Sequence, residues 1–170
     1  MDPIILPLLA LPPALVAWFF WTEFKGAGWQ PAPRKAIESA FRLARIGKGD
    51  IFYDLGAGDG RVIITAAKSG AQAVGIELDP LRYLICKTRL KVNRLEGKAR
   101  AVCGDIYNVP LNDATVIFVY LRDWSTERLK DKFKRELQPG TRIIAYHWPL
   151  ESWKPIAQDK ENGVYVYEIK

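Results

Sequence analysis

The chain has 170 residues, which is enough for one domain with a substantial hydrophobic core. It carries 25 Lys and Arg against 19 Asp and Glu. The net charge of +6 favours an anionic partner such as nucleic acid or lipid headgroups, although general solubility accounts for it equally well. Two cysteines outside any metal-ligand spacing and a single histidine exclude a metal centre and indicate a reducing compartment.

An uncharged, strongly apolar stretch occupies residues 4–21. As a helix it would span about 27 Å, close to the thickness of the hydrocarbon core of a bilayer. Asp2 precedes the stretch and basic residues follow it, so the positive-inside rule places the rest of the chain on the cytoplasmic side. We therefore expect residues 1–25 to be a membrane anchor. The alternative is a cytoplasmic protein whose apolar arm packs on its own domain or on a partner.

A linker rich in glycine and proline follows at residues 26–34. Trp29 within it either lies over a ligand or belongs to a plain connector. Apolar residues then recur on one face of a predicted helix at residues 35–46. We assign residues 35–170 to one domain.

A short apolar strand, a glycine-rich turn and an apolar helical pattern succeed one another from residue 51 to residue 67. This order is typical of the first unit of a nucleotide-binding α/β domain. Glycine is needed where the backbone turns sharply and touches a ligand. The candidate ligand-binding residues of this loop are Asp54, Gly56, Ala57, Gly58, Asp59 and Gly60.

Two acidic residues indicate which ligand the loop binds. A dinucleotide loop reads G-x-G-x-x-G and directs helix amides at a pyrophosphate. Here the spacing is G-x-G-x-G, with Asp54 before it and Asp59 inside it. Carboxylates repel a pyrophosphate, but they attract the sulfonium and amino groups of S-adenosyl-L-methionine. The loop therefore predicts a methyl-donor site.

Further carboxylates follow the next two predicted strands. Glu77 ends the strand at residues 73–78 and lies 17 residues after Gly60, close to the roughly 20 expected for a ribose-binding acid. Asp105 follows the apolar run 101–103 and suits the adenine amino group. The carboxyl ends of such strands line the crevice in which open α/β sheets bind ligands. The neighbouring residues Leu78 and Ile106 complete the predicted cofactor-binding set.

A helix begins after Asp79, with an acidic cap and a proline in its first turn. Its apolar positions share one face, which we expect to be core: Leu81, Leu84, Ile85 and Thr88. Its basic residues lie mostly elsewhere, and they either contact a substrate or are simply solvated: Arg82, Lys87, Arg89, Lys91 and Arg94.

The second half of the chain continues the alternation of predicted strands and helices. A continuous apolar run predicts a buried strand at residues 114–121, followed by a helix at 125–137 and a strand at 141–146. Residues near these strand ends are candidates for the acceptor site: Tyr120, Trp124, His147 and Trp148. A lone histidine is also common as an ordinary hydrogen-bonded residue.

A turn signal at Asn162-Gly163 precedes an alternating strand at residues 164–169 and predicts a C-terminal hairpin. The elements together predict an α/β fold. We expect a Rossmann-like, doubly wound sheet of seven strands, mostly parallel with an antiparallel C-terminal hairpin strand, plus an N-terminal hydrophobic helix.

The chain resembles the class I, seven-β-strand methyltransferases that use S-adenosyl-L-methionine. It is more narrowly similar to small archaeal protein-lysine methyltransferases and to mitochondrial enzymes acting on the adenine nucleotide translocase and the c-subunit of ATP synthase. The resemblance covers roughly residues 29–170 and departs from the family at Ala32, where threonine is usual. It rests on residues 29–33, 53–61, 75–80, 104–106, 135–142 and Trp153.

The resemblance implies a role for each matching residue. Asp54 and the loop glycines would hold the methionine part of the donor, Glu77 the ribose hydroxyls and Asp105 the adenine. Tyr120 and Trp29 would flank the methyl group and an incoming protein lysine. A domain tethered beside a membrane would act on lysines of membrane proteins.

Methyl transfer by in-line displacement depends on alignment of acceptor, methyl and sulfur. A free lysine with a pKa near 10.4 is neutral in only about one molecule in 2,500 at pH 7. Desolvation and the donor's sulfonium both lower that pKa, so we assign no catalytic base. The alternatives are an RNA methyltransferase, a small-molecule methyltransferase, and a donor-binding module without catalysis.

Overall fold

The computed structural model describes residues 30–121 and 123–170, except for the side chains of residues 123–127. Contacts divide the chain into residues 1–30 and a compact unit at residues 31–170. The predicted anchor and Trp29 lie outside the described residues. Within the described ranges, each helix is too short or too polar to cross a membrane.

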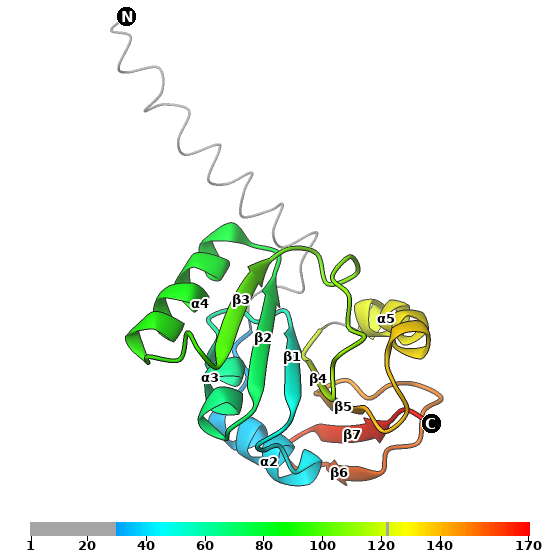
Figure 1. Cartoon of the computed structure of the whole chain (residues 1–170). Coiled ribbons are helices and arrows are strands. Elements are labelled where there is room, and N and C mark those ends of the chain that lie inside the picture. Colours follow the sequence, from blue (N-terminus) through cyan, green and yellow to red (C-terminus); the bar gives the residue numbers. More distant parts are fainter. Residues whose placement is uncertain (1–29, 122) are drawn as a thin grey trace, which may run out of the picture. The chain divides into compact units, whose positions relative to one another are not determined.

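A seven-stranded sheet forms the centre of this unit, in the order β3-β2-β1-β4-β5-β7-β6 (Figure 1). Strands β1 to β5 run parallel, and β7 runs antiparallel to both of its neighbours. The expected fold class is therefore confirmed. The strands are β1 (Ile51–Leu55), β2 (Gln72–Glu77), β3 (Ala99–Cys103), β4 (Val116–Val119), β5 (Arg142–Tyr146), β6 (Ala157–Asp159) and β7 (Val164–Glu168).

The helices cover the two faces of the sheet. Successive strand residues point to opposite faces, and Phe52 of β1 packs in a buried cluster with α2, α3 and α4 through residues such as Ala40, Ile63 and Leu90. Helix α5 packs on the other face, where Phe133 is fully buried (Figure 1). The helices are α2 (Arg34–Ala44), α3 (Arg61–Lys68), α4 (Pro80–Val92) and α5 (Asp123–Glu136).

The expectation for the buried face of α4 was wrong. This helix packs on the sheet through Cys86 and Leu90. The residues expected to be core are exposed: Leu81, Leu84, Ile85 and Thr88. A helical spacing shows that apolar residues share a face, but it does not show which way that face points, because the partner surface lies elsewhere in the sequence.

The end of helix α2 and the length of the hairpin turn differ from the prediction for local reasons. Helix α2 ends at Ala44 because Arg45 adopts a left-handed backbone conformation (φ 52°). Asn162-Gly163 is a signal for a two-residue turn, but the C-terminal hairpin has a four-residue turn, since Asp159 pairs with Val164 in the β6–β7 ladder. The Asp159 carboxylate accepts hydrogen bonds from the backbone N–H of Asn162 (3.1 Å) and from its side-chain amide (2.8 Å), which stabilises the longer turn.

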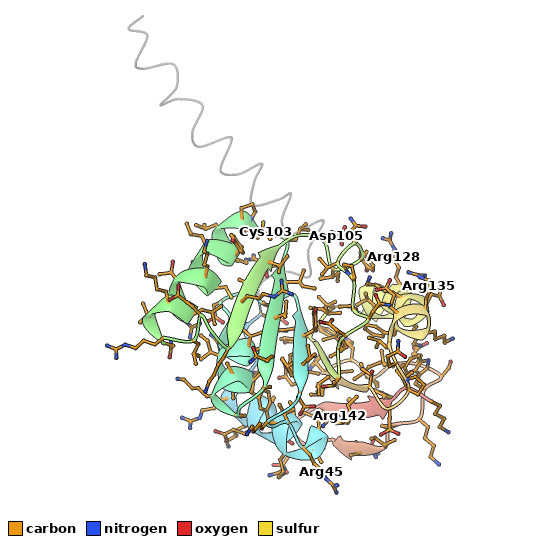
Figure 2. All side chains as sticks on the ribbon, in the orientation of Figure 1. Arg45, Cys103, Asp105, Arg128, Arg135 and Arg142 are labelled. Atoms are coloured by element: carbon orange, nitrogen blue, oxygen red, sulfur yellow. The ribbon has the colours of Figure 1, made fainter. Side chains whose placement is uncertain are left out.

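A polar network braces the amino ends of the central strands. Asp50 accepts a hydrogen bond from the hydroxyl of Thr115 (2.8 Å) and forms an ion pair with Arg142. Arg142 lies at this end of the sheet, whereas Cys103 and Asp105 lie at the opposite end (Figure 2). The amino ends of the central strands therefore carry stabilising polar contacts, and the predicted ligand site lies at the opposite, carboxyl ends.

Candidate active site

The loop between β1 and α3 depends on glycine for its shape. Gly56, Gly58 and Gly60 all have left-handed backbone conformations, with φ of 95°, 54° and 77°. At Gly60 a Cβ atom would also lie only 2.6 Å from Sγ of Cys86 in α4. Torsion and space therefore both favour glycine, and the loop backbone stays open to close approach by a ligand.

Glu77 at the end of β2 orients this loop. Its Oε2 atom accepts a hydrogen bond from the Gly58 N–H (2.7 Å), and its Oε1 atom accepts one from the Asp79 N–H (2.9 Å). The side chain is buried. A carboxylate oxygen has capacity for more than one donor, so a buried carboxylate held in this way can also receive the hydroxyl groups of a ribose.

Asp54 is the buried acid at the centre of the site. It lies in β1 between Gly75 of β2 and Phe118 of β4. Burial, followed by the charges of Glu77 and Asp59, raises the pKa of Asp54 to about 8. Asp54 is therefore mostly protonated at neutral pH in the free protein, and a cationic ligand group beside it would favour the ionised form.

Asp59 faces two arginines. Its Oδ2 atom lies 2.9 Å from Nη2 of Arg61, and the carboxylate forms a second, close ion pair with Arg89 of α4. Burial alone would raise the pKa of Asp59, but the Arg61 hydrogen bonds and both positive charges lower it below its ordinary value. Arg61 also donates to the carbonyl oxygen of Ala32 (3.3 Å). Asp59 thus joins the loop to α4 and, through Arg61, to the stretch before α2.

The third predicted carboxylate lies beyond the end of β3. In the β2–β3 pairing, Glu77 lies opposite Cys103, which is two residues before Asp105. The Oδ1 atom of Asp105 accepts a hydrogen bond from the N–H of Tyr107 (2.9 Å), which shapes the following turn. Partly buried residues after β2 and β3 complete this edge: Leu78, Asp105 and Ile106.

An aromatic cluster lies at the ends of β4 and β5. The ring of Tyr120 lies 4.4 Å from that of Tyr146 and stacks on Trp148 at 5.8 Å. The ring of His147 lies 4.5 Å from Trp148. We call these four residues the aromatic cluster. Burial raises the pKa of both tyrosines, so their phenol groups stay protonated at neutral pH.

The aromatic cluster adjoins the glycine loop through β4. Strand β4 pairs with β1, and a Cβ atom on Gly56 would lie 3.3 Å from Cδ2 of Leu121, the residue after Tyr120. On the other side, the N–H of His147 donates to the carbonyl oxygen of Gly163 in the hairpin turn (2.7 Å). His147 has φ 72°, a left-handed conformation that costs free energy and often occurs at functional sites.

The structure adds residues that the sequence did not single out. Tyr146 completes the aromatic cluster, and its position directly before His147 at a strand end was an available signal. Arg89, which the sequence analysis placed among residues that contact a substrate or are solvated, instead pairs with Asp59 across 30 positions of sequence, a contact that no local pattern indicates. Trp124 lies in the first turn of α5, and its side chain is outside the described residues.

The residues present suit S-adenosyl-L-methionine. The carboxyl groups of Asp54, Asp59 and Glu77 lie in or beside the glycine loop, and Asp59 engages the nearby arginines Arg61 and Arg89. This set would repel a pyrophosphate and attract a ligand with an amino group and a sulfonium.

Comparison with known proteins identifies the family. A profile described as the ANTKMT methyltransferase domain matches residues 54–157. The chain is 37% identical over 147 residues to a protein-lysine N-methyltransferase of Saccharolobus islandicus (strain REY15A), covering 82% of this chain and 91% of that protein.

Mammalian relatives are longer than this chain. It is 33% identical over 142 residues to the human lysine N-methyltransferase of the ATP synthase c-subunit, covering 81% of this chain and 60% of that protein. It is 33% identical over 144 residues to the mouse adenine nucleotide translocase lysine N-methyltransferase, covering 81% of this chain and 61% of that protein.

Among solved structures, the chain resembles an RNA methyltransferase from Salinibacter ruber in complex with S-adenosyl-L-homocysteine. The TM-score is 0.79 at 29% identity, covering 82% of this chain and 94% of that one. The expected resemblance and cofactor are confirmed. The chain belongs to the ANTKMT methyltransferase family and is an S-adenosylmethionine-dependent protein-lysine N-methyltransferase.

Proposed function

We propose that this enzyme methylates lysine side chains of membrane proteins and that the aromatic cluster receives the lysine amine. The observation that carries the proposal is the contact between the two halves of the site. The donor-side loop at Gly56 lies against Leu121, directly beside Tyr120 of the aromatic cluster. A ligand held by the loop would therefore lie next to a group inserted among the aromatic rings.

The donor side of the site would bind through charge and shape. Asp54 and the loop backbone would hold the amino-acid part of S-adenosyl-L-methionine, Glu77 the ribose hydroxyls and Asp105 the adenine amino group. When bound, this cofactor supplies the activated methyl group. Burial of Asp54 and the two backbone hydrogen bonds to Glu77 fix these carboxylates before binding, which lowers the cost of ordering the site.

The acceptor side would lower the pKa of the incoming lysine. Partly buried tyrosine and tryptophan rings remove water from the amine, and desolvation disfavours its charged form. Ring faces also attract the methylammonium product. The Tyr120 hydroxyl would orient the neutral amine, whose proton leaves to water before transfer. This scheme requires no dedicated general base.

Membrane substrates are supported by two features. The substrates named for the mammalian relatives are the c-subunit of ATP synthase and the adenine nucleotide translocase. In this chain, residues 4–21 form an uncharged apolar stretch long enough to enter a bilayer.

Deleting residues 1–24 is expected to move the enzyme from the membrane pellet of a cell lysate to the supernatant. Unchanged partitioning would contradict the anchor.

The test of the proposed function is methylation of soluble and membrane fractions with radiolabelled S-adenosyl-L-methionine. We expect nuclease-resistant, protein-bound label in the membrane fraction. Glu77→Ala should abolish the label, and Tyr120→Phe should reduce it while leaving S-adenosyl-L-homocysteine binding unchanged. Circular dichroism would verify that both variants are folded.

Other outcomes would redirect the assignment. Label that nuclease removes would indicate an RNA acceptor, the substrate class of the Salinibacter ruber enzyme. Label confined to soluble proteins would contradict the membrane substrate and leave lysine methylation intact. Donor binding without label in any macromolecule would favour a small-molecule acceptor.

A further inference from the structure

Helix α4 exposes a face of large apolar side chains. Leu81, Leu84, Ile85 and Val92 are 59%, 56%, 44% and 76% exposed. Their spacing places them on one side of the helix, opposite Cys86, Leu90 and the sheet. We call these four residues the α4 outer face. A continuous apolar face of this kind usually marks a contact with another surface.

The positive charge of the chain is concentrated around this face. Residues 80–94, which are α4 and the two residues after it, hold five lysine and arginine residues and no Asp or Glu, so their net charge of +5 is most of the +6 of the whole chain. The remaining residues contain 20 basic and 19 acidic side chains and are nearly balanced. Helix α4 itself has basic residues and no Asp or Glu.

These charges flank the α4 outer face on both sides. By helical geometry, Lys87 and Lys91 border one edge, and both are exposed. Arg82 and Arg89 border the other edge, where they also form ion pairs with Asp79 and Asp59. The result is an apolar stripe between two rows of cations.

We propose that the α4 outer face docks on an anionic lipid bilayer. Its leucine, isoleucine and valine side chains would enter the boundary between headgroups and acyl chains, and the flanking cations would contact lipid phosphates. A nucleic acid would use the cations and leave the apolar residues in water. A two-fold pairing of α4 with a second copy would bring two strongly positive segments together, which is unfavourable.

Docking on this face would orient the donor site. Asp79 caps α4 and lies two residues after Glu77, so the α4 outer face begins at the edge of the cofactor-binding residues. The bilayer would then lie beside the carboxyl end of β2. This contact is separate from the proposed anchor at residues 4–21 and does not depend on methyl transfer.

The first experiment places an environment-sensitive fluorophore on α4 in the full chain. Thr88→Cys lies on the exposed side of the helix, and Lys160→Cys in the hairpin turn is the control position. Exposed Cys103 is replaced by serine. Cys86 needs no replacement, because it is buried and burial raises the pKa of its thiol to about 12.

The labelled chains are mixed with vesicles of phosphatidylcholine alone or with added phosphatidylglycerol. We expect a blue shift at position 88 that is larger with the anionic lipid and no shift at position 160. Co-sedimentation without a shift at position 88 would overturn the proposal, as would equal shifts at both positions. A blue shift at position 88 in buffer alone would also overturn it, because the chain itself or a second copy would then cover the face.

The second experiment separates apolar from charged contributions. In the full chain labelled at position 88, Leu84→Ser is expected to reduce the blue shift on anionic vesicles several-fold, because it removes an apolar contact of α4 even while residues 4–21 hold the chain on the vesicle. Ile156→Ser is the matched control, since Ile156 is 59% exposed and lies outside α4. Equal losses for both variants would contradict docking through α4.

The charge comparison uses paired lysine variants. Lys87→Gln with Lys91→Gln should reduce the preference for anionic over neutral vesicles, whereas Lys154→Gln with Lys160→Gln, at two other exposed lysines, should not. The proposal would be overturned if the chain bound single-stranded RNA, if this binding required Lys87 and Lys91 but tolerated Leu84→Ser, and if the RNA prevented vesicle binding. That result would assign the α4 outer face to nucleic acid.

Discussion

Asp54 links the chemistry of the site to protonation. Burial and the nearby carboxylates of Glu77 and Asp59 hold its pKa at about 8. In the unliganded protein, the folded state binds the Asp54 proton more tightly than the unfolded chain does. The stability that this proton contributes to the folded state is fully present below the ordinary pKa of 3.8 and is lost as pH rises through about 8. In the proposed role of Asp54, a cationic group of the donor would favour the ionised form, so donor binding would be coupled to proton release.

We therefore expect the affinity for S-adenosyl-L-homocysteine to rise with pH, by up to about tenfold per unit between pH 6 and 7.5. Its amino group is the cation that favours ionised Asp54. Isothermal titration calorimetry in buffers of different ionisation enthalpy should detect proton release on binding. Asp54→Asn should bind more weakly and lose this pH dependence. A wild-type affinity that does not change with pH would contradict the role of Asp54.

Gly60 tests the packing of the loop. Gly60→Ala and Gly140→Ala both place alanine at a left-handed residue, which costs about 1–2 kcal/mol. Only Gly60→Ala also forces a contact with Cys86, so we expect a further loss of about 1–3 kcal/mol in the free energy of unfolding. Urea denaturation of both variants measures the difference. Adding Cys86→Ala to Gly60→Ala should recover part of it.

At the scale of elements, the turn between β2 and α4 joins the donor site to the helix. The Asp79 side chain accepts hydrogen bonds from the N–H groups of Leu81 (2.8 Å) and Arg82 (3.2 Å). Its own N–H donates to Glu77, which in turn holds Gly58. The start of α4 and the shape of the glycine loop therefore depend on the same residues.

Asp79→Ala is expected to lower the free energy of unfolding by about 1 kcal/mol through loss of the helix cap. It should also weaken donor binding, because the backbone that holds Glu77 becomes less ordered. Asp79→Asn retains a capping oxygen and should change both quantities much less. Thermal unfolding and calorimetric titration of the two variants would provide the comparison, and equal losses for both would rule out the cap as the cause.

At the scale of the whole molecule, the two halves of the sheet present different kinds of side chain for the proposed reaction. Strands β1 to β3 end in the acidic donor side, and β4 and β5 end in the aromatic cluster. The order of strands changes direction between β1 and β4, the position at which α/β sheets bind ligands. In the proposed mechanism, lysine desolvation and donor binding would therefore take place on neighbouring but separate surfaces.

The acceptor chemistry predicts a pH profile. At saturating donor, kcat/KM for a lysine peptide should rise by close to tenfold per pH unit from pH 7 to pH 9, because the neutral amine becomes more abundant. Saturation with donor removes the effect of Asp54 on binding. Initial rates with a radiolabelled donor would measure the profile. A flat profile in a chemistry-limited assay would count against a lysine acceptor.

The sequence alone determined the alternation of elements, the glycine loop and the acids Asp54, Glu77 and Asp105, because each depends on local spacing along one strand and its following turn. Tertiary structure decided the pairing of Asp59 with Arg89 and the meeting of Tyr120 with Tyr146. It also decided that the apolar face of α4 points outward. Periodicity specifies how residues are placed within an element, whereas the direction in which an element faces depends on partners that are distant in sequence.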